Sequence, residues 1–309
     1  MSKPHTIQSV IAPISGKARV DLIGNAACVE GDSLQVMKAM EDGVVDLTMT
    51  SPPYNLGIPY ADGIDDAQPR AVYLDWMREV FGELHRILKD DGQVLVNIGG
   101  SLVDPGVPYE VLQVARDAGF QLQNNIIWAK HISVDDQLSI GHFKPVNSDR
   151  FLNNVFEHVF HLTKDRKRPI DRLSVGVKFV HPSNLSRWNH TRDKRCRGNI
   201  WMVPYETVTS QRDAAHPATY PEQLVKMGLS LMGAKKGQII LDPFVGTGTT
   251  SAVAAMKGID SIGIEMSPTY AAAFRARIAR TLTPGDAPIR RPRVVKTRKL
   301  DEAPVFSGF

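Results

Sequence analysis

The segment at residues 239–265 constrains the fold of this chain more than any other. An apolar run at 239–241 leads into an acidic turn, a Gly-x-Gly loop at 246–248 and a stretch with helical character at 249–257. A second apolar run follows and ends in Glu265. Strand, helix and strand in this order predict a βαβ unit, whose two parallel strands need a crossover helix between them. The chain is therefore expected to fold around a parallel sheet.

The loop of this unit has the features of a site for a nucleoside. Gly246 and Gly248 allow the backbone to approach a ligand closely. Glu265 follows the glycines by roughly 20 residues, the spacing at which a carboxylate binds ribose hydroxyls. Two phosphate-binding patterns do not fit, because no lysine follows the second glycine and a serine replaces the third glycine of the dinucleotide fingerprint. Asp242 and Phe244 instead favour an adenosyl group that carries a charged amino acid and no pyrophosphate.

A second motif, Thr-Ser-Pro-Pro-Tyr at residues 50–54, follows an apolar run at 44–49 that is expected to be a strand. The two prolines fix φ and remove backbone donors, and the residue before a proline is extended. The motif therefore predicts a stiff loop whose carbonyls point outward. Such a loop can accept hydrogen bonds from an exocyclic amino group while the Tyr54 ring covers a planar base. Alone, a Pro-Pro pair is more typical of a proline-capped turn, and it is the glycine motif that shifts the interpretation toward binding.

Together the two motifs resemble those of the DNA amino-methyltransferases. Residues 242–250 resemble the family's S-adenosylmethionine loop, and residues 51–54 resemble its catalytic motif. The catalytic motif precedes the cofactor motif, an order similar to that of the family's permuted beta group. The resemblance extends over roughly residues 26–282. It implies S-adenosylmethionine as the cofactor, double-stranded DNA as the partner, and a Rossmann-like, doubly wound, mostly parallel α/β sheet with an inserted basic target-recognition region.

The resemblance also implies direct transfer of a methyl group to the exocyclic nitrogen of a base that has left the duplex. The catalytic residues that it implies are Ser51, Pro52, Pro53 and Tyr54. Ser51 and the Pro52 carbonyl would accept the two hydrogens of the amine, and Tyr54 would stack on the base. Carbon-5 methylation of cytosine needs a cysteine nucleophile, and the sequence has no Pro-Cys motif.

The residue at position 51 bears on which base is methylated. In the family, aspartate at this position usually accompanies adenine N6 and serine usually accompanies cytosine N4. Ser51 therefore implies a sequence-specific, cytosine-N4-specific DNA methyltransferase. The Asn55-Leu56 that follows is common among adenine enzymes, so adenine N6 stays the alternative. The motif order and the basic insertion argue against an RNA or protein-glutamine amino-methyltransferase. The intact Ser-Pro-Pro-Tyr motif argues against a binding protein that has lost catalysis.

The residues expected to bind S-adenosylmethionine come from both halves of the chain. They are Asp32, Asp242, Pro243, Phe244, Gly246, Gly248, Thr249, Glu265 and His216. For Asp32, a cap of the helix predicted at 33–40 is an equally good interpretation. The segment around His216 resembles one that opens a helix beside the methionine end of the cofactor, and a proline-started helix without a His216 contact is the simpler interpretation.

Positive charge is concentrated in one part of the chain. The formal net charge is +4 for 309 residues, yet residues 164–197 alone hold eleven Lys or Arg against three Asp. Basic side chains neutralise phosphates, and aromatic or amide side chains contact bases, so this segment is expected to be the recognition region. The residues expected to bind DNA are Arg166, Lys167, Arg168, Arg172, Arg187, Trp188, Arg192, Lys194, Arg195 and Arg197. The alternative is a solvated, irregular surface insertion.

The remaining pattern alternates strands and helices, which implies a sheet covered by helices on both faces, with ligands at the carboxyl ends of its strands. Further strands are expected at 26–30, 94–98, 122–128 and 156–162, and helices at 33–40, 73–88 and 109–118. The long acidic loop at 55–70 is expected to be a lid or disordered. The expected organisation is a catalytic half at 21–163, the recognition region at 164–211, a cofactor-binding half at 212–282 and a basic flexible tail at 283–309.

Composition sets further limits. No run of about 18 apolar residues occurs, and the amino terminus lacks the apolar core of a secretion signal. Cys28 and Cys196 are the only cysteines, and neither has the spacing of metal ligands. The expected protein is therefore cytoplasmic, without a membrane span or a metal. A homodimer and a cognate restriction endonuclease of the same system stay open as partners.

Overall fold

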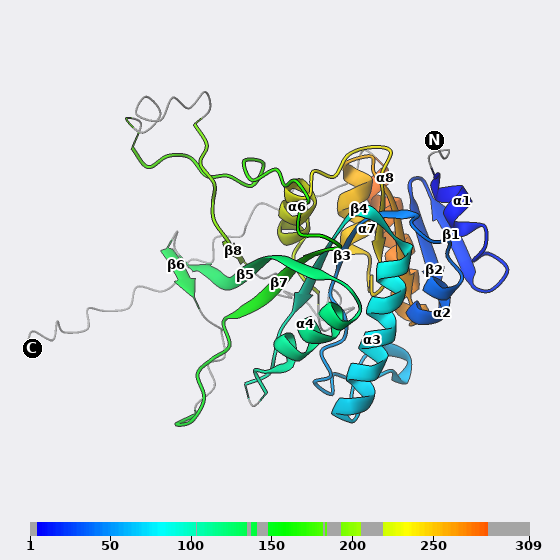
Figure 1. Ribbon diagram of the computed structural model, residues 1–309, viewed down its shortest axis with the longest axis horizontal. Coiled ribbons are helices and arrows are strands. Elements are labelled where there is room, and N and C mark those ends of the chain that lie inside the picture. The colour runs from blue at the N-terminus through cyan, green and yellow to red at the C-terminus, as the bar shows by residue number, and fades with distance from the viewer. Residues whose placement is uncertain are drawn as a thin grey trace, which may run out of the picture.

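The computed structural model describes residues 5–102, 104–134, 137–140, 148–181, 183, 193–204 and 219–283. They build one 10-stranded sheet with helices on both faces (Figure 1). The strands are β1 (Arg19–Ile23), β2 (Ala26–Glu30), β3 (Val45–Thr50), β4 (Leu88–Ile98), β5 (Gln121–Val134), β6 (Gln137–Ile140), β7 (Phe156–Thr163), β8 (Ile200–Pro204), β9 (Ile239–Asp242) and β10 (Asp260–Glu265). The helices are α1 (Ile7–Ile11), α2 (Ser33–Lys38), η1 (Ala61–Gly63), α3 (Arg70–Ile87), α4 (Val107–Asp117), α6 (Glu222–Leu231), α7 (Thr249–Met256) and α8 (Pro268–Leu282).

The strands follow the order β1-β2-β10-β9-β3-β4-β7-β5-β6, and β8 pairs with β5 beside this path. The strands from β2 to β4 in this order are all parallel to one another. β7 is antiparallel to both β4 and β5, and β1 and β6 are antiparallel to their neighbours. The predicted Rossmann-like, mostly parallel α/β sheet is confirmed, and its parallel part carries both sequence motifs.

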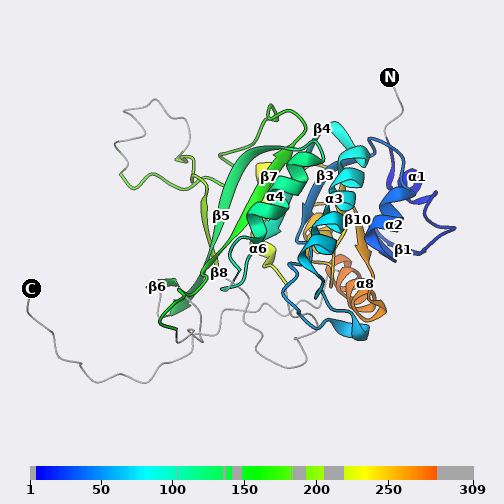
Figure 2. The ribbon, with the colours of Figure 1, turned by 60° about the horizontal axis from the view of Figure 1, so that its bottom comes forward.

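Helices cover the two faces of the sheet separately. α2, α3 and α4 contribute to the largest core cluster on one face, where α3 and α4 lie side by side (Figure 2). α6 and α7 contribute to a second cluster on the other face, and α8 joins a third one with β2. Both faces are therefore buried, as expected for a sheet with parallel strands.

The apolar periodicity of α3 explains why this helix covers the sheet. Tyr73, Met77, Phe81 and Leu84 recur at helical spacing, and all four are buried. Each such burial stabilises the fold by ~1.5–3 kcal/mol relative to an exposed side chain. α7 differs, because its alanine-rich sequence is buried from Thr249 through the following six residues. It lies against β9, β10 and the neighbouring helices.

The expected strands and helices are present with shifted bounds, and the structure adds elements that the pattern does not predict. β1 is an edge strand without a regular alternation of buried and exposed residues, so its sequence gives little periodic signal. β8 lies inside the segment 164–211 that was expected to be an insertion. Trp201 and Val203 on β8 are buried in the core, so this part of the segment belongs to the sheet. Of the tail expected at 283–309, all residues after Thr283 lie outside the described residues.

Two absences concern the described residues only. Within those ranges no helix is long and apolar enough to cross a membrane. In the same part of the chain, no group of three His, Cys, Asp or Glu side chains is placed to hold a metal ion. Both cysteines are free, Cys28 buried and Cys196 exposed.

We expect Gly248 to tolerate no side chain. It precedes α7 with a φ of 89°, and an added Cβ would lie 2.7 Å from Cδ2 of Phe274. Gly248→Ala should therefore lower the free energy of unfolding by ~2–5 kcal/mol, through left-handed backbone strain and an overpacked contact. Gly258→Ala is the matched control, because its φ is 66° and nothing lies within 4 Å of an added Cβ. Gly258→Ala should lower the free energy of unfolding only through backbone strain, by ~1–2 kcal/mol. Equal losses in urea unfolding would contradict the packing argument.

Candidate active site at the carboxyl ends of the strands

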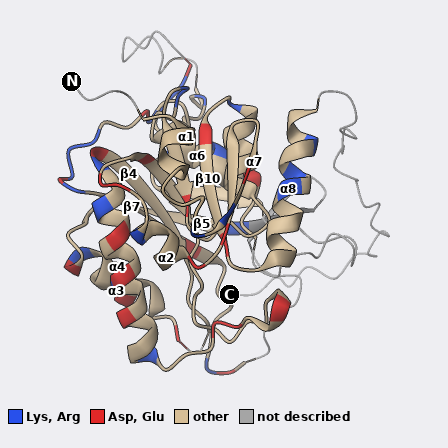
Figure 3. Ribbon diagram, turned by 90° about the vertical axis from the view of Figure 1, so that its right-hand side faces the viewer, with Lys and Arg blue, Asp and Glu red and all other residues tan. Residues whose placement is uncertain are grey.

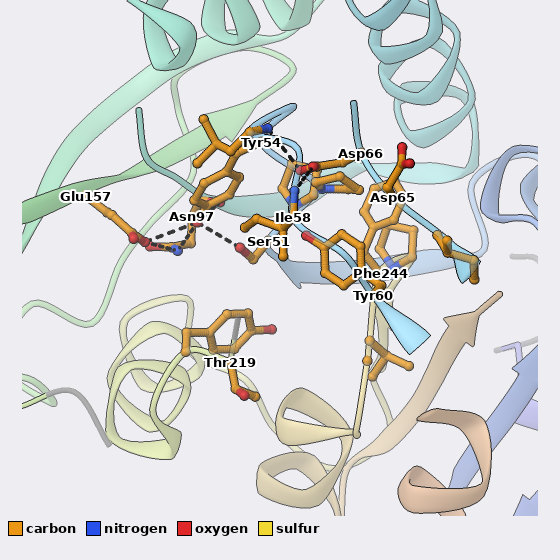
Figure 4. Close-up of a pocket in the computed structure, with 18 of the residues that line it drawn as sticks. Ser51, Tyr54, Ile58, Tyr60, Asp65, Asp66, Asn97, Glu157, Thr219 and Phe244 are labelled. Carbon is orange, nitrogen blue, oxygen red and sulfur yellow. Dashed lines mark hydrogen bonds between the residues drawn. The ribbon is translucent and has the colours of Figure 1, made fainter. Parts of the chain in front are cut away.

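A cavity of about 640 Å³ lies at the carboxyl ends of the parallel strands. Its walls come from the residues that follow β3 and β9, from the ends of β4 and β10, and from the start of α2. Residues 51–54 line it from one side and residues 243–246 from another (Figure 4). The sheet thus brings the two sequence motifs to one cavity, as expected for strands that all end at the same edge.

Glu265 ends β10 and lies in the cavity wall beside the glycine loop. Its Oε2 accepts a hydrogen bond from the Gly246 amide at 2.9 Å, and its Oε1 accepts one from the Ser267 amide at 2.8 Å. Burial raises the pKa of this carboxyl. A carboxylate has about four lone-pair sites, so Glu265 can still accept a hydrogen bond from a ligand hydroxyl.

Asp242 is 1% exposed and does not belong to the described cavity wall. Its carboxylate accepts hydrogen bonds from Thr50 Oγ1 at 2.7 Å, Thr250 Oγ1 at 2.6 Å and Tyr220 OH at 2.9 Å. The Phe244 amide donates to it at 3.1 Å. Burial raises the pKa of the carboxyl. The expectation that Asp242 contacts the cofactor is therefore revised, because its oxygens are occupied in joining β3, β9 and α7.

Aromatic rings cover another part of the wall. The Phe244 ring meets the Trp76 ring edge-on at 5.6 Å between centroids, and Tyr60 also lines the cavity.

Asp32 both caps a helix and lines the cavity, so the two interpretations of this residue are compatible. Its Oδ1 accepts a hydrogen bond from the Gln35 amide at 2.9 Å as the cap of α2, and the residue lines the cavity as well.

The residues expected to bind the cofactor divide into three groups. Those that line the cavity are Asp32, Pro243, Phe244, Gly246, Thr249 and Glu265. Asp242 and Gly248 are described but lie behind this wall, where Gly248 meets Phe274. His216 lies outside the described residues.

All four residues of the expected catalytic motif, Ser51, Pro52, Pro53 and Tyr54, line the cavity. The Tyr73 hydroxyl donates to the Pro53 carbonyl at 2.8 Å, which fixes the loop against α3. Ser51 Oγ lies 2.9 Å from the Tyr54 hydroxyl oxygen (Figure 4). The loop therefore presents a serine hydroxyl and a tyrosine side chain that are already linked to each other.

Three of the polar residues in the cavity wall that the sequence pattern does not single out lie next to one another: Asn97 on β4, Lys130 on β5 and Glu157 on β7. Asn97 Nδ2 donates to Glu157 Oε2 at 2.7 Å, and the Tyr54 hydroxyl donates to the same oxygen at 3.1 Å. Lys130 Nζ lies 2.5 Å from Glu157 Oε1, and the two side chains are only 19% and 12% exposed. The available signal was a charged residue inside one expected apolar strand, Glu157 in 156–162, and another two residues beyond the expected strand 122–128, Lys130.

The acidic loop at 55–70 forms part of the cavity wall. The buried Asp66 carboxylate accepts hydrogen bonds from the Leu56 amide at 3.2 Å and the Ile58 amide at 2.7 Å. Asp62 accepts a bond from Thr269 Oγ1 at 2.9 Å, at the start of α8. The Asp66 bonds join two parts of the loop to each other, and the Asp62 bond holds the loop against the start of α8.

The basic segment begins at the end of the sheet opposite to the cavity. β7 is antiparallel to β4, with His158 opposite Ile98 and Thr163 opposite Gln93. The chain therefore leaves β7 near the amino end of β4, where Lys164 Nζ donates to the first carbonyl of that strand at 2.8 Å. The expected DNA-binding residues that follow directly are Arg166, Lys167, Arg168 and Arg172.

The remaining described residues of the expected DNA-binding set are attached to that same segment. Lys194 Nζ donates to the Leu173 carbonyl at 3.4 Å, and Arg197 Nε donates to the Val175 carbonyl at 2.9 Å. Arg195 forms an antiparallel β-bridge with Val177 of that segment. Arg187, Trp188 and Arg192 lie outside the described residues. The basic residues that directly follow β7 thus lie at the end of the sheet opposite to the cavity.

Positive charge on α8 is engaged within the fold. This helix carries three arginines and no acidic residue (Figure 3). Arg275 pairs with Asp21 and Glu30, and Arg277 pairs with Glu222. Much of the positive charge of α8 is therefore balanced by neighbouring carboxylates.

A different segment, residues 148–155, lies at the cavity edge. It precedes β7, whose first residues pair with the part of β5 that reaches the cavity. Asn153 and Asn154 line the cavity. Arg150 is exposed, and Leu152 is 91% exposed. This segment therefore offers a basic and an apolar side chain beside the cavity.

Comparisons with known proteins agree with this arrangement. The model of a DNA methylase family matches residues 45–276. The chain is 29% identical over 260 residues to the DNA adenine methyltransferase YhdJ of Escherichia coli (strain K12), and the match covers 80% of this chain and 81% of that protein.

Solved structures share the fold. The PvuII DNA methyltransferase, described as cytosine-N4-specific, superposes with a TM-score of 0.61 at 21% identity, covering 82% of this chain and 86% of that one. A putative DNA modification methylase of Thermus thermophilus, solved in complex with S-adenosyl-L-methionine, superposes with a TM-score of 0.57 at 24% identity, covering 85% and 96%. At these identities the likeness establishes a common architecture.

Proposed function

Because the chain belongs to the DNA methylase family, whose model matches residues 45–276, we propose that it methylates N4 of cytosine in DNA. S-adenosylmethionine-dependent methylation of an exocyclic amine in DNA follows from the family. The choice of cytosine is carried by one observation: Ser51, an uncharged hydroxyl, stands first in the catalytic motif and lines the cavity. Serine at this position is the form that resembles the cytosine-N4 enzymes.

S-adenosylmethionine is the cofactor, and the residues of the cavity fit it. Glu265 keeps lone pairs for ribose hydroxyls, and Phe244 and Trp76 offer apolar ring surface for an adenine. Asp32 presents a carboxylate to the same cavity, where it would attract an amino group. When bound, the cofactor supplies an electrophilic methyl group on a sulfonium.

The residues of the chain act on the base. Ser51 and the Pro52 carbonyl accept the hydrogens of the exocyclic amine, which opposes delocalisation of its lone pair into the ring and makes the nitrogen more nucleophilic. Tyr54 stacks on the base and holds it in the cavity. The acceleration comes from positioning and from acceptors placed in advance.

Adenine N6 is the alternative, because YhdJ is described as a DNA adenine methyltransferase. The same two acceptors can serve either amine. An aspartate would bind the amine through a stronger, charge-assisted hydrogen bond, and this chain has Ser51 instead. The family match favours DNA over RNA or a protein glutamine as the substrate.

We propose that the duplex approaches the edge of the sheet at residues 148–155. A base that leaves the stack must enter the cavity, and this segment borders it. Arg150 is placed to contact a phosphate, whereas Arg166 lies at the other edge of the sheet. This placement replaces the assignment of the basic segment to the DNA that delivers the target base.

The product identifies the base. After incubation of unmethylated phage DNA with the protein and S-adenosylmethionine, digestion to nucleosides and mass spectrometry should detect N4-methylcytosine. A reaction without protein is the control. N6-methyladenine would refute the choice of base and keep the mechanism, and 5-methylcytosine would refute the mechanism.

Glu265 should contribute to cofactor binding. Glu265→Ala removes the carboxylate that would accept bonds from the ribose hydroxyls, so S-adenosylmethionine affinity should fall by ~1–3 kcal/mol in calorimetry. Glu30→Ala is the matched control. Glu30 lies opposite Glu265 in the register of β2 and β10 but outside the described cavity wall, so its loss should leave affinity unchanged. A folded Glu265→Ala protein with unaltered affinity would exclude the contact.

Arg150 and Arg166 should differ in their effect on DNA affinity. Each phosphate contact lowers log K by about 0.9 per unit of log salt concentration. Arg150→Ala should therefore weaken DNA binding and reduce the salt slope by about 0.9, whereas Arg166→Ala should change neither. Fluorescence anisotropy with a duplex over a range of salt concentrations measures both quantities. A larger loss for Arg166→Ala would return the DNA to the basic segment.

A further inference from the structure

We propose that Glu157 is a positioning residue that acts on the target amine through the hydroxyls of Tyr54 and Ser51. The inference rests on the proposed function in one respect, because Ser51 is taken as the acceptor of an amine hydrogen. It holds for either base. It assigns to Glu157 the negative charge that a serine motif lacks beside the amine.

Three oxygens form a continuous chain from β7 to the catalytic loop. Glu157 Oε2 lies 3.1 Å from the Tyr54 hydroxyl oxygen, which lies 2.9 Å from Ser51 Oγ. Asn97 Nδ2 is 2.7 Å from both Glu157 Oε2 and the Tyr54 oxygen. Lys130 holds the other carboxylate oxygen at 2.5 Å, which leaves Oε2 directed toward Tyr54. Figure 4 shows Glu157, Asn97, Tyr54 and Ser51 joined in this way.

The donors and acceptors of this chain have one consistent direction. Asn97 presents its amide nitrogen, which only donates, and the ion-paired carboxylate of Glu157 only accepts. The single hydrogen of Tyr54 goes to the strongest acceptor within reach, the charged carboxylate. Burial and the charge of Glu157 raise the pKa of Tyr54 well above its usual value, so the hydroxyl keeps that hydrogen.

The consequence falls on Ser51. Since the Tyr54 oxygen has given its hydrogen to Glu157, it can only accept from Ser51. Ser51 must then donate its own hydrogen to Tyr54, and its remaining lone pairs are free for the amine of the base. Hydrogen bonds in a chain polarise one another, so the carboxylate makes the serine oxygen a better acceptor than an isolated hydroxyl.

The backbone leaves room for this contact. Gly99 follows β4, and an added Cβ there would lie 2.9 Å from Cγ of Glu157 and 3.2 Å from Cε2 of Tyr54. A side chain at position 99 would therefore press on both members of the chain. The close approach of Glu157 and Tyr54 thus depends on a glycine that faces the two of them.

A double-mutant cycle tests the inference. Single-turnover transfer of tritiated methyl groups from S-adenosylmethionine to unmethylated phage DNA is measured with the full chain in excess. Glu157→Gln keeps the shape and removes the charge, and Tyr54→Phe keeps the ring and removes the hydroxyl. Each should slow transfer by about 100-fold, the usual effect of one lost electrostatic contact at a reacting centre. The double variant should be no slower than Tyr54→Phe alone, because Glu157 acts only through that hydroxyl.

Tyr73→Phe supplies the matched control. It also removes a buried hydroxyl that is bonded to the catalytic loop, but this hydroxyl donates to the Pro53 carbonyl and lies outside the chain of oxygens. Its effect should multiply with that of Glu157→Gln. Losses for Glu157→Gln and Tyr54→Phe that multiply, or a full rate for Glu157→Gln, would overturn the inference.

Two further points keep the test decisive. Glu157→Gln leaves Lys130 without its partner, so if that variant does not fold, the cycle is run with Glu157→Gln and Lys130→Met combined, and the same non-additivity is expected. The tritium readout counts methyl groups on either base. Finding N6-methyladenine in a nucleoside digest would thus refute the proposed choice of cytosine and leave the cycle interpretable, whereas multiplying losses would refute the role of Glu157 and leave the choice of base intact.

Discussion

The buried carboxylate of Asp242 holds together the two loops that line the cavity. It binds Thr50 at the end of β3 and Thr250 at the start of α7, so the strand that leads into the catalytic motif and the helix that follows the glycine loop share one acceptor. A buried carboxylate is costly unless hydrogen bonds compensate for the loss of water. Here the Tyr220 hydroxyl and the Phe244 amide complete the set. Because these donors share one buried acceptor, a shift of either loop would break hydrogen bonds to a carboxylate that has no water to replace them.

The direction of the strands decides which residues meet at the cavity. The parallel strands β3, β4, β9 and β10 all end at one edge, which brings Ser51, Asn97 and Glu265 together. β7 runs the opposite way, so its first residues lie at that edge and its last ones lie at the other. This reversal places Glu157 in the cavity and carries the basic segment away from it. One antiparallel pairing thus accounts both for the polar group beside Tyr54 and for the start of the basic segment at the other end of the sheet.

The link between Glu157 and Ser51 explains how a serine at position 51 can accept a hydrogen of the target amine as an aspartate would. A carboxylate that touches the amine gives a strong acceptor and a full negative charge beside the base. A hydroxyl linked to a more distant carboxylate gives a polarised acceptor, while the charge stays paired with Lys130. Which atoms donate and which accept in the cavity therefore depends on all four linked residues, Ser51, Tyr54, Asn97 and Glu157. Loss of any one of them would change the hydrogen bonds of the others.

The sequence by itself determined the βαβ unit, the long helix α3 and the two motifs, because periodicity, glycines and prolines act over neighbouring residues and are legible in any segment that contains them. It also determined that both motifs would meet, since parallel strands share one carboxyl edge. Only the tertiary structure decided that Glu157 and Lys130 line the cavity, that Asp242 supports the loops from behind, and that the basic segment begins at the other end of the sheet. These facts depend on which strands pair and in which direction, and pairing is a contact between distant segments that neither segment specifies locally. A charge within an apolar strand was visible in the sequence, but its partner became known only when β5, β7 and the loop after β3 came together around one cavity.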